Sequence, residues 1–321
     1  MTTLPTRAYA GEPDLPLIVE LFDACEAVDQ LGLVTNEAML RGEFCEPGFD
    51  PARDLHLWEG AGGALLALGR LWVSPPDEQT EVIVWPYVHP AARESNLEEQ
   101  IIAWAERRAH EVAHERGVQA RLRCHVREDQ TMRIARMERL GFRLARSFLR
   151  MGCHLDGALP DAVAPEGFTI RPLAGPEEAP AWADTYNTSF SDHWNAHTIG
   201  AEHITHLIAH DPHYQPGGNL IALAPDGSMA GICYNYTNPE EQDNGGMVGW
   251  VEALGVRREY RRAGLGQALL LTGLRWLQSQ GAASAKLSVD ADSPTGATRL
   301  YEVCGFRRLL VNRVYLKEEL L

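Results

Sequence analysis

A glycine- and arginine-rich segment is the part of this sequence whose spacing most directly suggests chemistry. After an apolar stretch that ends at Val256, the chain reads R-R-E-Y-R-R-A-G-L-G-Q, and an amphipathic pattern starts at Leu265. Backbone N–H groups at the start of a helix point toward one spot, where the helix dipole also favours negative charge. Gly264 and Gly266 have no Cβ, so a bulky anion can approach the backbone there. The segment therefore predicts an anion-binding turn.

The charge around this turn is the reverse of that of the whole chain. The protein has 29 basic and 44 acidic residues and a formal net charge of −15. Four arginines nevertheless crowd the turn: Arg257, Arg258, Arg261 and Arg262. Such a cluster suits a polyanionic ligand. A glycine turn with solvated arginines is the alternative, and a G-x-G pattern alone does not exclude it.

The turn must be held by a strand before it and a helix after it. The pattern predicts a strand over Trp250–Val256, a helix over about Leu265–Gln280 and a further strand over Ala285–Asp290. Ser293 and Pro294 are predicted as the N-cap and first position of the last helix. Continuous apolar runs elsewhere in this half predict strands that are covered on both faces. The fold class is therefore α/β, with mixed sheets flanked by helices.

The same order of elements occurs twice. Val88 and Val256 are 168 residues apart, and Gly141 and Gly305 are 164 residues apart. Offsets this similar indicate duplication of one unit, as expected for two domains. We predict a first domain at 1–157, a linker at 158–166 and a second domain at 167–321. The matching elements of the first half are predicted at Glu81–Val88, Asn96–Glu115 and Ala120–Val126.

Composition narrows the classes of protein to consider. With 45% apolar and 23% charged residues, the chain is typical of a globular protein. Its acidic balance argues against broad binding to nucleic acid or to anionic membranes. The six cysteines form no C-x-x-C pair and predict reduced thiols without zinc. With no apolar signal segment or membrane span, we expect a cytoplasmic protein that is a monomer or homodimer.

Two motifs resemble those of one enzyme family. The string R-R-A-G-L-G matches the [QR]-x-x-G-x-[GA] motif of the GNAT (GCN5-related) N-acetyltransferases, and the segment L-Y-E-V-C-G-F resembles the end of their last helix. The resemblance is strong over Gly249–Tyr315. It implies two tandem GNAT-like domains, each a mostly antiparallel mixed sheet flanked by helices.

The resemblance also implies an activity and a cofactor. It implies an N-acetyltransferase that moves an acetyl group directly from acetyl-CoA, as co-substrate, to a primary amine of a small molecule, with no metal. In this family the turn binds the CoA pyrophosphate, and the preceding strand splays from its neighbour to pair with the pantetheine arm. The implied cofactor contacts are Leu254, Gly255, Val256, Arg261, Arg262, Ala263, Gly264, Leu265, Gly266, Gln267 and Ser293.

Two side chains and one amide carry the implied chemistry. Tyr301 matches the family's tyrosine, which acts as general acid toward the CoA sulfur; a buried structural tyrosine is the alternative. Glu252 lies four residues before Val256, so strict alternation predicts that both side chains share one face of the strand. Glutamates here often serve the family as general base. An ordinary carboxyl pKa of about 4.3 is poorly matched to an ammonium, so a raised pKa or a water relay is required. The N–H of Leu254 would polarise the thioester carbonyl.

The first half lacks these groups at the matching positions. Val84 stands where the second half has Glu252, and Met137 where it has Tyr301. Asn96 and Glu98 replace the two glycines of the turn, and a carboxylate there would repel a phosphate. We therefore predict a non-catalytic first domain that is structural or helps to wall the acceptor site.

The acceptor is not identified by the sequence. The tandem layout and the string S-P-T-G-A also resemble the mycothiol synthase-like acetyltransferases, but the spacing of Glu252 from Val256 departs from that pattern, which leaves the acceptor open. The segment Tyr186–Tyr214 is rich in polar and aromatic residues and is expected to shape the acceptor pocket. Three further interpretations stay open: a non-catalytic CoA-binding module, transfer of a longer acyl group, and a metal or acceptor role for His203, His206 and His210.

Overall fold

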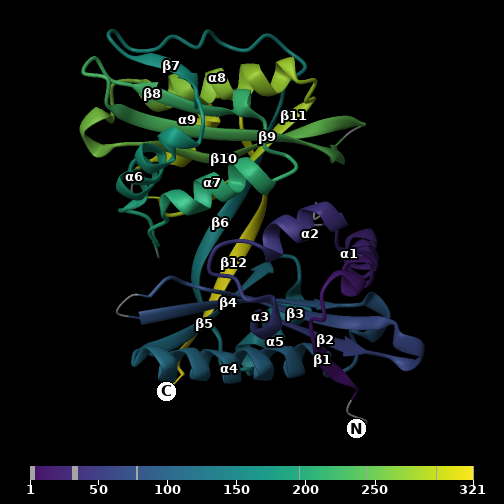
Figure 1. Cartoon of the computed structure of the whole chain (residues 1–321). Helices are drawn as coiled ribbons and strands as arrows, with labels where there is room; N and C mark the ends of the chain where they lie inside the picture. Colours follow the sequence, from purple (N-terminus) through teal and green to yellow (C-terminus); the bar gives the residue numbers. More distant parts are fainter. Residues whose placement is uncertain are drawn as a thin grey trace. The chain divides into compact units, whose positions relative to one another are not determined.

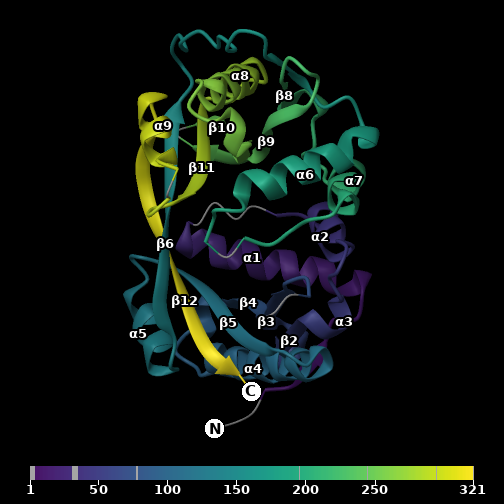
Figure 2. The same ribbon diagram turned by 90° about the vertical axis from the view of Figure 1, so that its left-hand side faces the viewer.

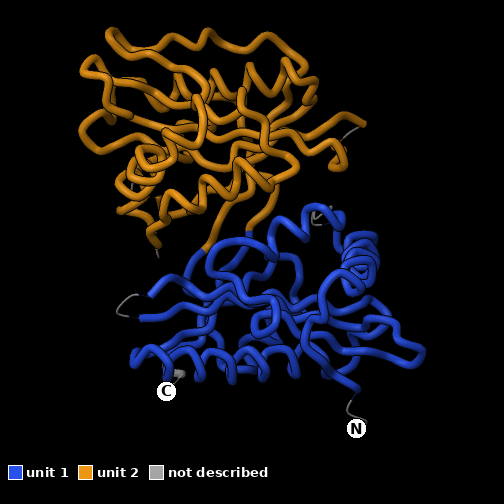
Figure 3. Tube along the Cα trace, in the orientation of Figure 1, with its two compact units in different colours: residues 1–146, 312–321 blue, residues 147–311 orange. Residues whose placement is uncertain are grey.

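The chain forms two compact units. The computed structural model describes residues 4–30, 35–76, 79–194, 196–243, 245–293 and 295–320. Unit 1 comprises residues 1–146 and 312–321, and unit 2 comprises residues 147–311 (Figure 3).

Unit 1 is built on the sheet β1-β2-β3-β4-β5. Its pairs are antiparallel except for the parallel pair β4–β5. One long helix, α4, packs on one face through Ile101 and Ala105, whereas α1 packs on the other face through Ile18 and Leu21 (Figures 1 and 2). The elements are β1 (Thr6–Ala8), α1 (Leu15–Asp29), α2 (Glu37–Phe44), α3 (Pro51–Asp54), β2 (Leu55–Glu59), β3 (Leu65–Val73), β4 (Gln79–Val88), α4 (Leu97–Arg116), β5 (Gln119–Arg127) and α5 (Thr131–Arg139).

Unit 2 is built in the same way on the sheet β6-β11-β10-β9-β8-β7. Only the pair β10–β11 is parallel among the strand pairs described in this unit. The helix α8 covers one face, while α6 and α7 cover the other (Figures 1 and 2). The elements are β7 (Thr169–Pro172), α6 (Ala179–Phe190), α7 (Ala201–His210), β8 (Asn219–Leu223), β9 (Met229–Asp243), β10 (Gly246–Val256), α8 (Leu265–Ser279), β11 (Ser284–Asp290) and α9 (Ala297–Val303).

The last strand of each repeat continues into the other unit. The strand β6 (Arg143–His154) follows the first Gly-Phe pair, yet it pairs with β11 of unit 2 from Phe148 to His154. The strand β12 (Arg307–Leu320) follows the second Gly-Phe pair, yet it pairs with β5 of unit 1 from Asn312 onward. Each unit thus receives a strand from the other repeat.

This exchange separates the compact units from the sequence repeats. The units divide at 146/147 and 311/312, whereas the repeats were predicted to meet at 158–166. That predicted linker has no helix or strand and lies inside unit 2. The repeat limits stay a prediction about the duplication, because strand pairing over long sequence distances, and not local composition, sets the folded units.

The predicted elements of the second half match the observed ones, with one exception. The stripe on α8 is buried as expected, with Leu269, Leu270 and Leu274 each 0% exposed. The predicted start of the last helix is wrong. The amide of Ser293 donates to the carbonyl of Asp290, which makes a turn, and α9 begins only after Gly296, whose φ is 71°. Pro294 lies outside the described residues.

Candidate active site

The first turn of α8 presents amides that have no helical partner. Gly264 precedes the helix at a φ of 88°, which favours glycine, and no side chain caps this end among the described residues. The first ladder bond is donated by Ala268 to the Gly264 carbonyl at 3.0 Å. The amides of Leu265, Gly266 and Gln267 therefore have no acceptor within the helix. Such a helix start is suited to bind an anion.

Gly266 is not required by the packing of the protein itself. A Cβ built at this position would lie 3.6 Å from Leu300 Cδ2 and 3.7 Å from Val256 Cγ2, which are ordinary contacts. The missing side chain therefore leaves the backbone open without being needed for the fold. The same contact places α9, the helix that carries Tyr301, beside the turn.

Three of the four arginines are already paired. The Arg261 Nε donates to the Val256 carbonyl at 3.0 Å, and its terminal nitrogens donate to Asp192 at 2.9 Å and to the Ser189 carbonyl at 2.9 Å. Arg258 also pairs with Asp192, and Arg257 pairs with Asp184 on α6 at 2.6 Å. These arginines therefore brace the turn against α6 and the loop that follows it.

Arg262 differs from the other three. Its backbone is left-handed, with a φ of 65°, and its side chain is exposed. It forms no ion pair within the described part of the chain. Of the two arginines expected to contact the cofactor, Arg262 therefore has the free charge, while Arg261 holds the turn in shape.

The strands β10 and β11 diverge before the turn. Their pairing covers Val248–Trp250 against Ser284–Lys286, although β10 continues to Val256 and β11 to Asp290. The Arg257 amide donates to the Ala230 carbonyl on β9 at 2.9 Å. Because an antiparallel ladder alternates, the backbone groups of Gly255 face β9.

The same alternation determines which backbone groups at the end of β10 are available to pair with a ligand. The backbone groups of Leu254 and Val256 face away from β9, toward the divergence. An extended ligand can pair there with Leu254 and with the amide of Val256, whose carbonyl accepts from Arg261. Gly255 is needed instead for packing, since a Cβ there would lie 2.9 Å from that of Ser189. Leu254 thus presents a free backbone edge and Val256 a free amide, because the Val256 carbonyl already accepts from Arg261, whereas the backbone groups of Gly255 face β9.

A β-bulge sets the direction of Glu252. Val251 pairs with Asn235 and Ala253 pairs with Tyr234, so Glu252 is the extra residue of β10. Val256 packs against the core under α8. The Glu252 carboxylate instead acts electrostatically on tyrosines that pack under α6 and α7: Tyr186, Tyr234 and Tyr236. The expectation that Glu252 and Val256 share a face is therefore wrong, because the bulge interrupts the alternation.

The surroundings of Glu252 favour its protonated form. Its side chain is exposed, yet surrounding protein atoms desolvate the carboxylate and raise its pKa above the ordinary value. The charge of Asp211 raises the pKa further, whereas that of Arg150 lowers it. A glutamate with a raised pKa is a better proton acceptor for an amine than an ordinary one.

Tyr301 lies on the opposite face of the sheet from Glu252. It belongs to the core under α8, is 7% exposed, and packs edge-on against Phe306 with ring centroids 5.9 Å apart. Burial raises the pKa of its phenol, so the hydroxyl stays protonated and able to donate. It forms no hydrogen bond within the described residues.

The remaining predicted positions are less informative. Ser293 follows β11, and its hydroxyl pairs with that of Thr295 at 2.9 Å. On α7 the rings of His206 and His210 lie 4.6 Å apart. No group of three or more possible metal ligands occurs among the described residues, and the role of the α7 histidines stays untested.

Sequence analysis missed two groups near Glu252. Arg150 on β6 lies over the Trp250 ring, with the guanidinium carbon 4.6 Å from the centroid. Asp211, at the end of α7, accepts a hydrogen bond from the Tyr234 hydroxyl at 3.4 Å. Neither has a local sequence signal, because strand register and helix packing bring them to the site from far along the chain.

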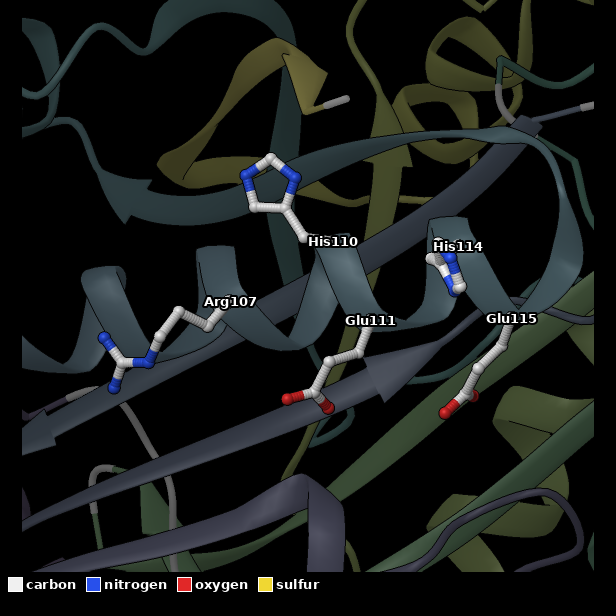
Figure 4. A pocket seen from close by; sticks show the side chains of 5 residues that line it. All are labelled: Arg107, His110, Glu111, His114 and Glu115. Atoms are coloured by element: carbon white, nitrogen blue, oxygen red, sulfur yellow. The ribbon is translucent and has the colours of Figure 1, made fainter.

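The matching helix start of unit 1 carries a buried carboxylate. Glu98 in the first turn of α4 is 4% exposed, and its carboxylate pairs with Arg133 at 2.7 Å and with Arg136 at 2.5 Å. Val84 and Met137, which the sequence offsets align with Glu252 and Tyr301, are each 0% exposed, and β4 has no bulge at Val84. A pocket of this unit is lined only by residues of α4 (Figure 4), from Arg107 to Glu115, and does not include the turn.

The comparisons with known proteins agree on one family. Residues 179–306 match the acetyltransferase (GNAT) family model. The chain is 28% identical to a mycothiol acetyltransferase of Thermobispora bispora, over 94% of this chain and 95% of the relative. It is 30% identical to that of Salinispora tropica, over 77% of this chain and 76% of the relative.

Solved structures extend the similarity to the whole chain. A GCN5-related N-acetyltransferase from Sphaerobacter thermophilus superposes with a TM-score of 0.74 and 26% identity, covering 99% of this chain and 96% of that one. A tandem GNAT protein from the clavulanic acid biosynthesis pathway, at 16% identity, has the same fold, with a TM-score of 0.71 and 98% of both chains covered. Among the described residues, every helix is too short or too polar to cross a membrane. The chain therefore belongs to the GNAT acetyltransferases and is a tandem-GNAT N-acetyltransferase related to the mycothiol acetyltransferases.

Proposed function

We propose that unit 2 is the catalytic unit and that it transfers an acetyl group from acetyl-CoA to a primary amine of a small molecule. The observation that carries this proposal is the contrast between the two helix starts. In unit 2 the amides of Leu265, Gly266 and Gln267 are open and four arginines lie in the turn, whereas in unit 1 the position of Gly266 is a glutamate, Glu98, whose buried carboxylate pairs with Arg133 and Arg136. A buried carboxylate in the first turn of α4 would repel the pyrophosphate of CoA, and the turn of unit 2 has none.

The diverging strands would position the acetyl group. The pantetheine arm would pair with the backbone groups of Leu254 and with the amide of Val256. In this position the Leu254 amide would donate to the thioester carbonyl oxygen, where negative charge develops when the amine attacks.

Two side chains on opposite faces of the sheet would accept and donate the protons of the reaction. Glu252 would accept the proton of the ammonium, directly or through a water molecule, so that the free amine nitrogen can bond to the thioester carbon. As the carbon–sulfur bond breaks, the thiolate would receive a proton from the Tyr301 hydroxyl. The attacking nitrogen would lose its second proton, which reprotonates the phenolate through solvent, so the products are an N-acetylated amine, CoA thiol and the one proton taken up by Glu252. The opposite placement keeps base and acid apart.

The side chains on the sheet face under α6 and α7 indicate the class of acceptor. The tyrosines and the two carboxylates of Glu252 and Asp211 lie under α6 and α7 and suit an ammonium group. The acceptor acetylated by the mycothiol acetyltransferases is one member of this class and belongs in any panel of amines.

The test has a binding step and a turnover step. Calorimetry of the pure protein with acetyl-CoA should register one binding site per chain, and release of CoA thiol should depend on the presence of an amine. No binding of acetyl-CoA, or two sites per chain, would contradict the assignment of catalysis to unit 2 alone.

A further inference from the structure

Arg150 holds an unusual position on the acceptor side of unit 2. It lies on β6 opposite Ser288 of β11, and its guanidinium covers the face of Trp250. The indole N–H of Trp250 donates to Glu241 at 2.7 Å, which fixes the ring beneath the guanidinium. Trp250 also stacks on Tyr236, with ring planes 12° apart, so Arg150 lies on the same face as Glu252.

The positive charge of Arg150 is not paired with a carboxylate. Its Nε is buried without a hydrogen-bond partner, and the side chain forms no ion pair within the described residues. The nearby Glu241 is already paired with Lys286 at 3.0 Å. Glu252 influences Arg150 electrostatically, but no hydrogen bond joins them. Because burying an unpaired charge is costly, this geometry leaves the guanidinium with unused capacity for an anion.

The arginine is present on β6, which pairs in unit 2, but not at the matching position of β12, which pairs in unit 1. Arg150 lies nine residues after Gly141, and the residue nine positions after Gly305 is Val314. Val314 is 0% exposed and completes the core of unit 1. A strand that served only to complete a sheet would be expected to place an apolar residue here, as β12 does.

We propose that Arg150 binds an oxyanion of the acceptor, a carboxylate or a phosphate, so that the preferred substrates are amines that also carry a negative group. The guanidinium would bind the anionic group of the acceptor, while Glu252 and Asp211 bind its ammonium group. The site would thus be positive at one end of the acceptor and negative at the other. Arg150 is then a specificity-determining residue contributed to the second repeat's site by the strand of the first. This inference rests on the proposed function, since it concerns the acceptor side of the same site.

The turnover experiment uses matched pairs of amines. Each α-amino acid is compared with its neutral carboxamide, and O-phosphoethanolamine with ethanolamine, by release of CoA thiol from the full chain. For wild type we expect a KM about tenfold or more lower for the anionic member. In Arg150→Gln this preference should disappear through a higher KM for the anionic member, with kcat little changed. The carboxylate and phosphate arms distinguish the two kinds of oxyanion.

Arg150→Lys, Arg107→Gln and a pH profile separate recognition from a merely structural role. Arg107, exposed on α4 in unit 1, is the matched control, and its substitution should leave every KM unchanged. Arg150→Lys keeps the charge but loses the planar fork, so it should restore part of the preference. A glutamine variant that shifts the pH profile equally for anionic and neutral amines would show that Arg150 only balances Glu252, and would overturn the proposal.

A binding measurement keeps the inference distinct from the proposed function. N-acetylated amino acids, which resemble products, are titrated into wild type and Arg150→Gln in the presence of CoA. Loss of binding in the variant supports the oxyanion site even if no amine is turned over. Acetylation of amines without any preference for anionic ones, together with equal binding by both proteins, would overturn this inference and leave the proposed function intact.

Discussion

The turns before α4 in unit 1 and before α8 in unit 2 are braced in the same way by an arginine. In unit 2 the Arg261 Nε donates to the Val256 carbonyl and the guanidinium pairs with Asp192. In unit 1, 168 residues earlier, the Arg93 Nε donates to the Val88 carbonyl and the guanidinium pairs with Asp29. The motif's first arginine is therefore a brace in both units, whatever the unit binds.

The contents of the two helix starts are opposite. The place of Gly266 in unit 2 is taken in unit 1 by Glu98, whose buried carboxylate lies between Arg133 and Arg136 of α5. A carboxylate in the first turn of a helix is stabilised by the helix dipole and disfavours a second anion there. Unit 1 thus has the arginine brace of the turn together with a buried carboxylate of its own beside the helix start.

The strands before the turns differ as well. The pairing of β4 with β5 extends to Val84 and Cys124, and the antiparallel partner β3 follows β4 without a bulge. In unit 2 the pairing with β11 ends at Trp250, and the bulge at Glu252 turns the carboxylate to the face under α6. The unit proposed to be catalytic therefore differs from the other near the turn by the absence of a buried carboxylate, by one bulge and by the length of one strand pair.

The largest effect is expected when Gly266 of unit 2 is replaced by glutamate, the residue that unit 1 has at the matching position. In Gly266→Glu a carboxylate would occupy the amides of α8 and repel the pyrophosphate, so we expect acetyl-CoA affinity to fall by about a thousandfold and turnover to vanish. Gly266→Ala is the control, because a Cβ fits there in ordinary contact and should weaken binding far less. Calorimetry with acetyl-CoA measures both, and full affinity in the glutamate variant would refute the assigned phosphate site.

Removing the proton acceptor is expected to have the next largest effect. Glu252→Gln should lower kcat/KM by about a hundredfold, the usual scale for loss of a general base. In wild type, kcat/KM should rise with pH through the raised pKa of Glu252, and this limb should be lost in the variant. A pH–rate profile checks the result; an unchanged acid limb would assign it to another group.

The same substitution should affect stability in the opposite direction. Because the pKa of Glu252 is higher in the folded than in the unfolded state, ionisation favours unfolding as pH rises above the unfolded value. The stability contributed by the protonated form is present in acid and lost toward neutral pH. Glu252→Gln should therefore raise Tm at neutral pH and leave it unchanged in acid, and a lower Tm at neutral pH would contradict the raised pKa.

Local sequence signals predicted only part of this site. The helix at Leu265 and the open turn follow from apolar periodicity and two glycines, which act over a few residues. The bulge has no such signal, since Val251, Glu252 and Ala253 include no glycine or proline to mark it. The brace to Asp192 and the arrival of Arg150 depend on contacts across long sequence separations, which periodicity does not encode.

Loss of the proton donor should be milder than loss of the acceptor. Tyr301→Phe keeps the ring packed against Phe306 and removes only the hydroxyl, so we expect kcat to fall about tenfold with little change in acetyl-CoA affinity. Phe306→Leu serves as a packing control: it should lower Tm without a comparable loss of kcat from the folded enzyme. Unchanged turnover in Tyr301→Phe would make the residue a structural tyrosine.

The smallest effect on catalysis is expected for a substitution of Glu98 in unit 1. Glu98→Gln keeps the size of the side chain but leaves Arg133 and Arg136 without their shared carboxylate. Both arginines are partly exposed, which moderates the cost, so we expect the free energy of unfolding to fall by about 2 kcal/mol. Because the substitution lies outside the unit proposed to be catalytic, kcat and KM of the folded enzyme should not change. Thermal unfolding and steady-state kinetics measured on one preparation separate the two effects. A change in kcat at unchanged stability would mean that unit 1 takes part in turnover, and that the buried carboxylate of Glu98 has a role beyond stabilising the fold.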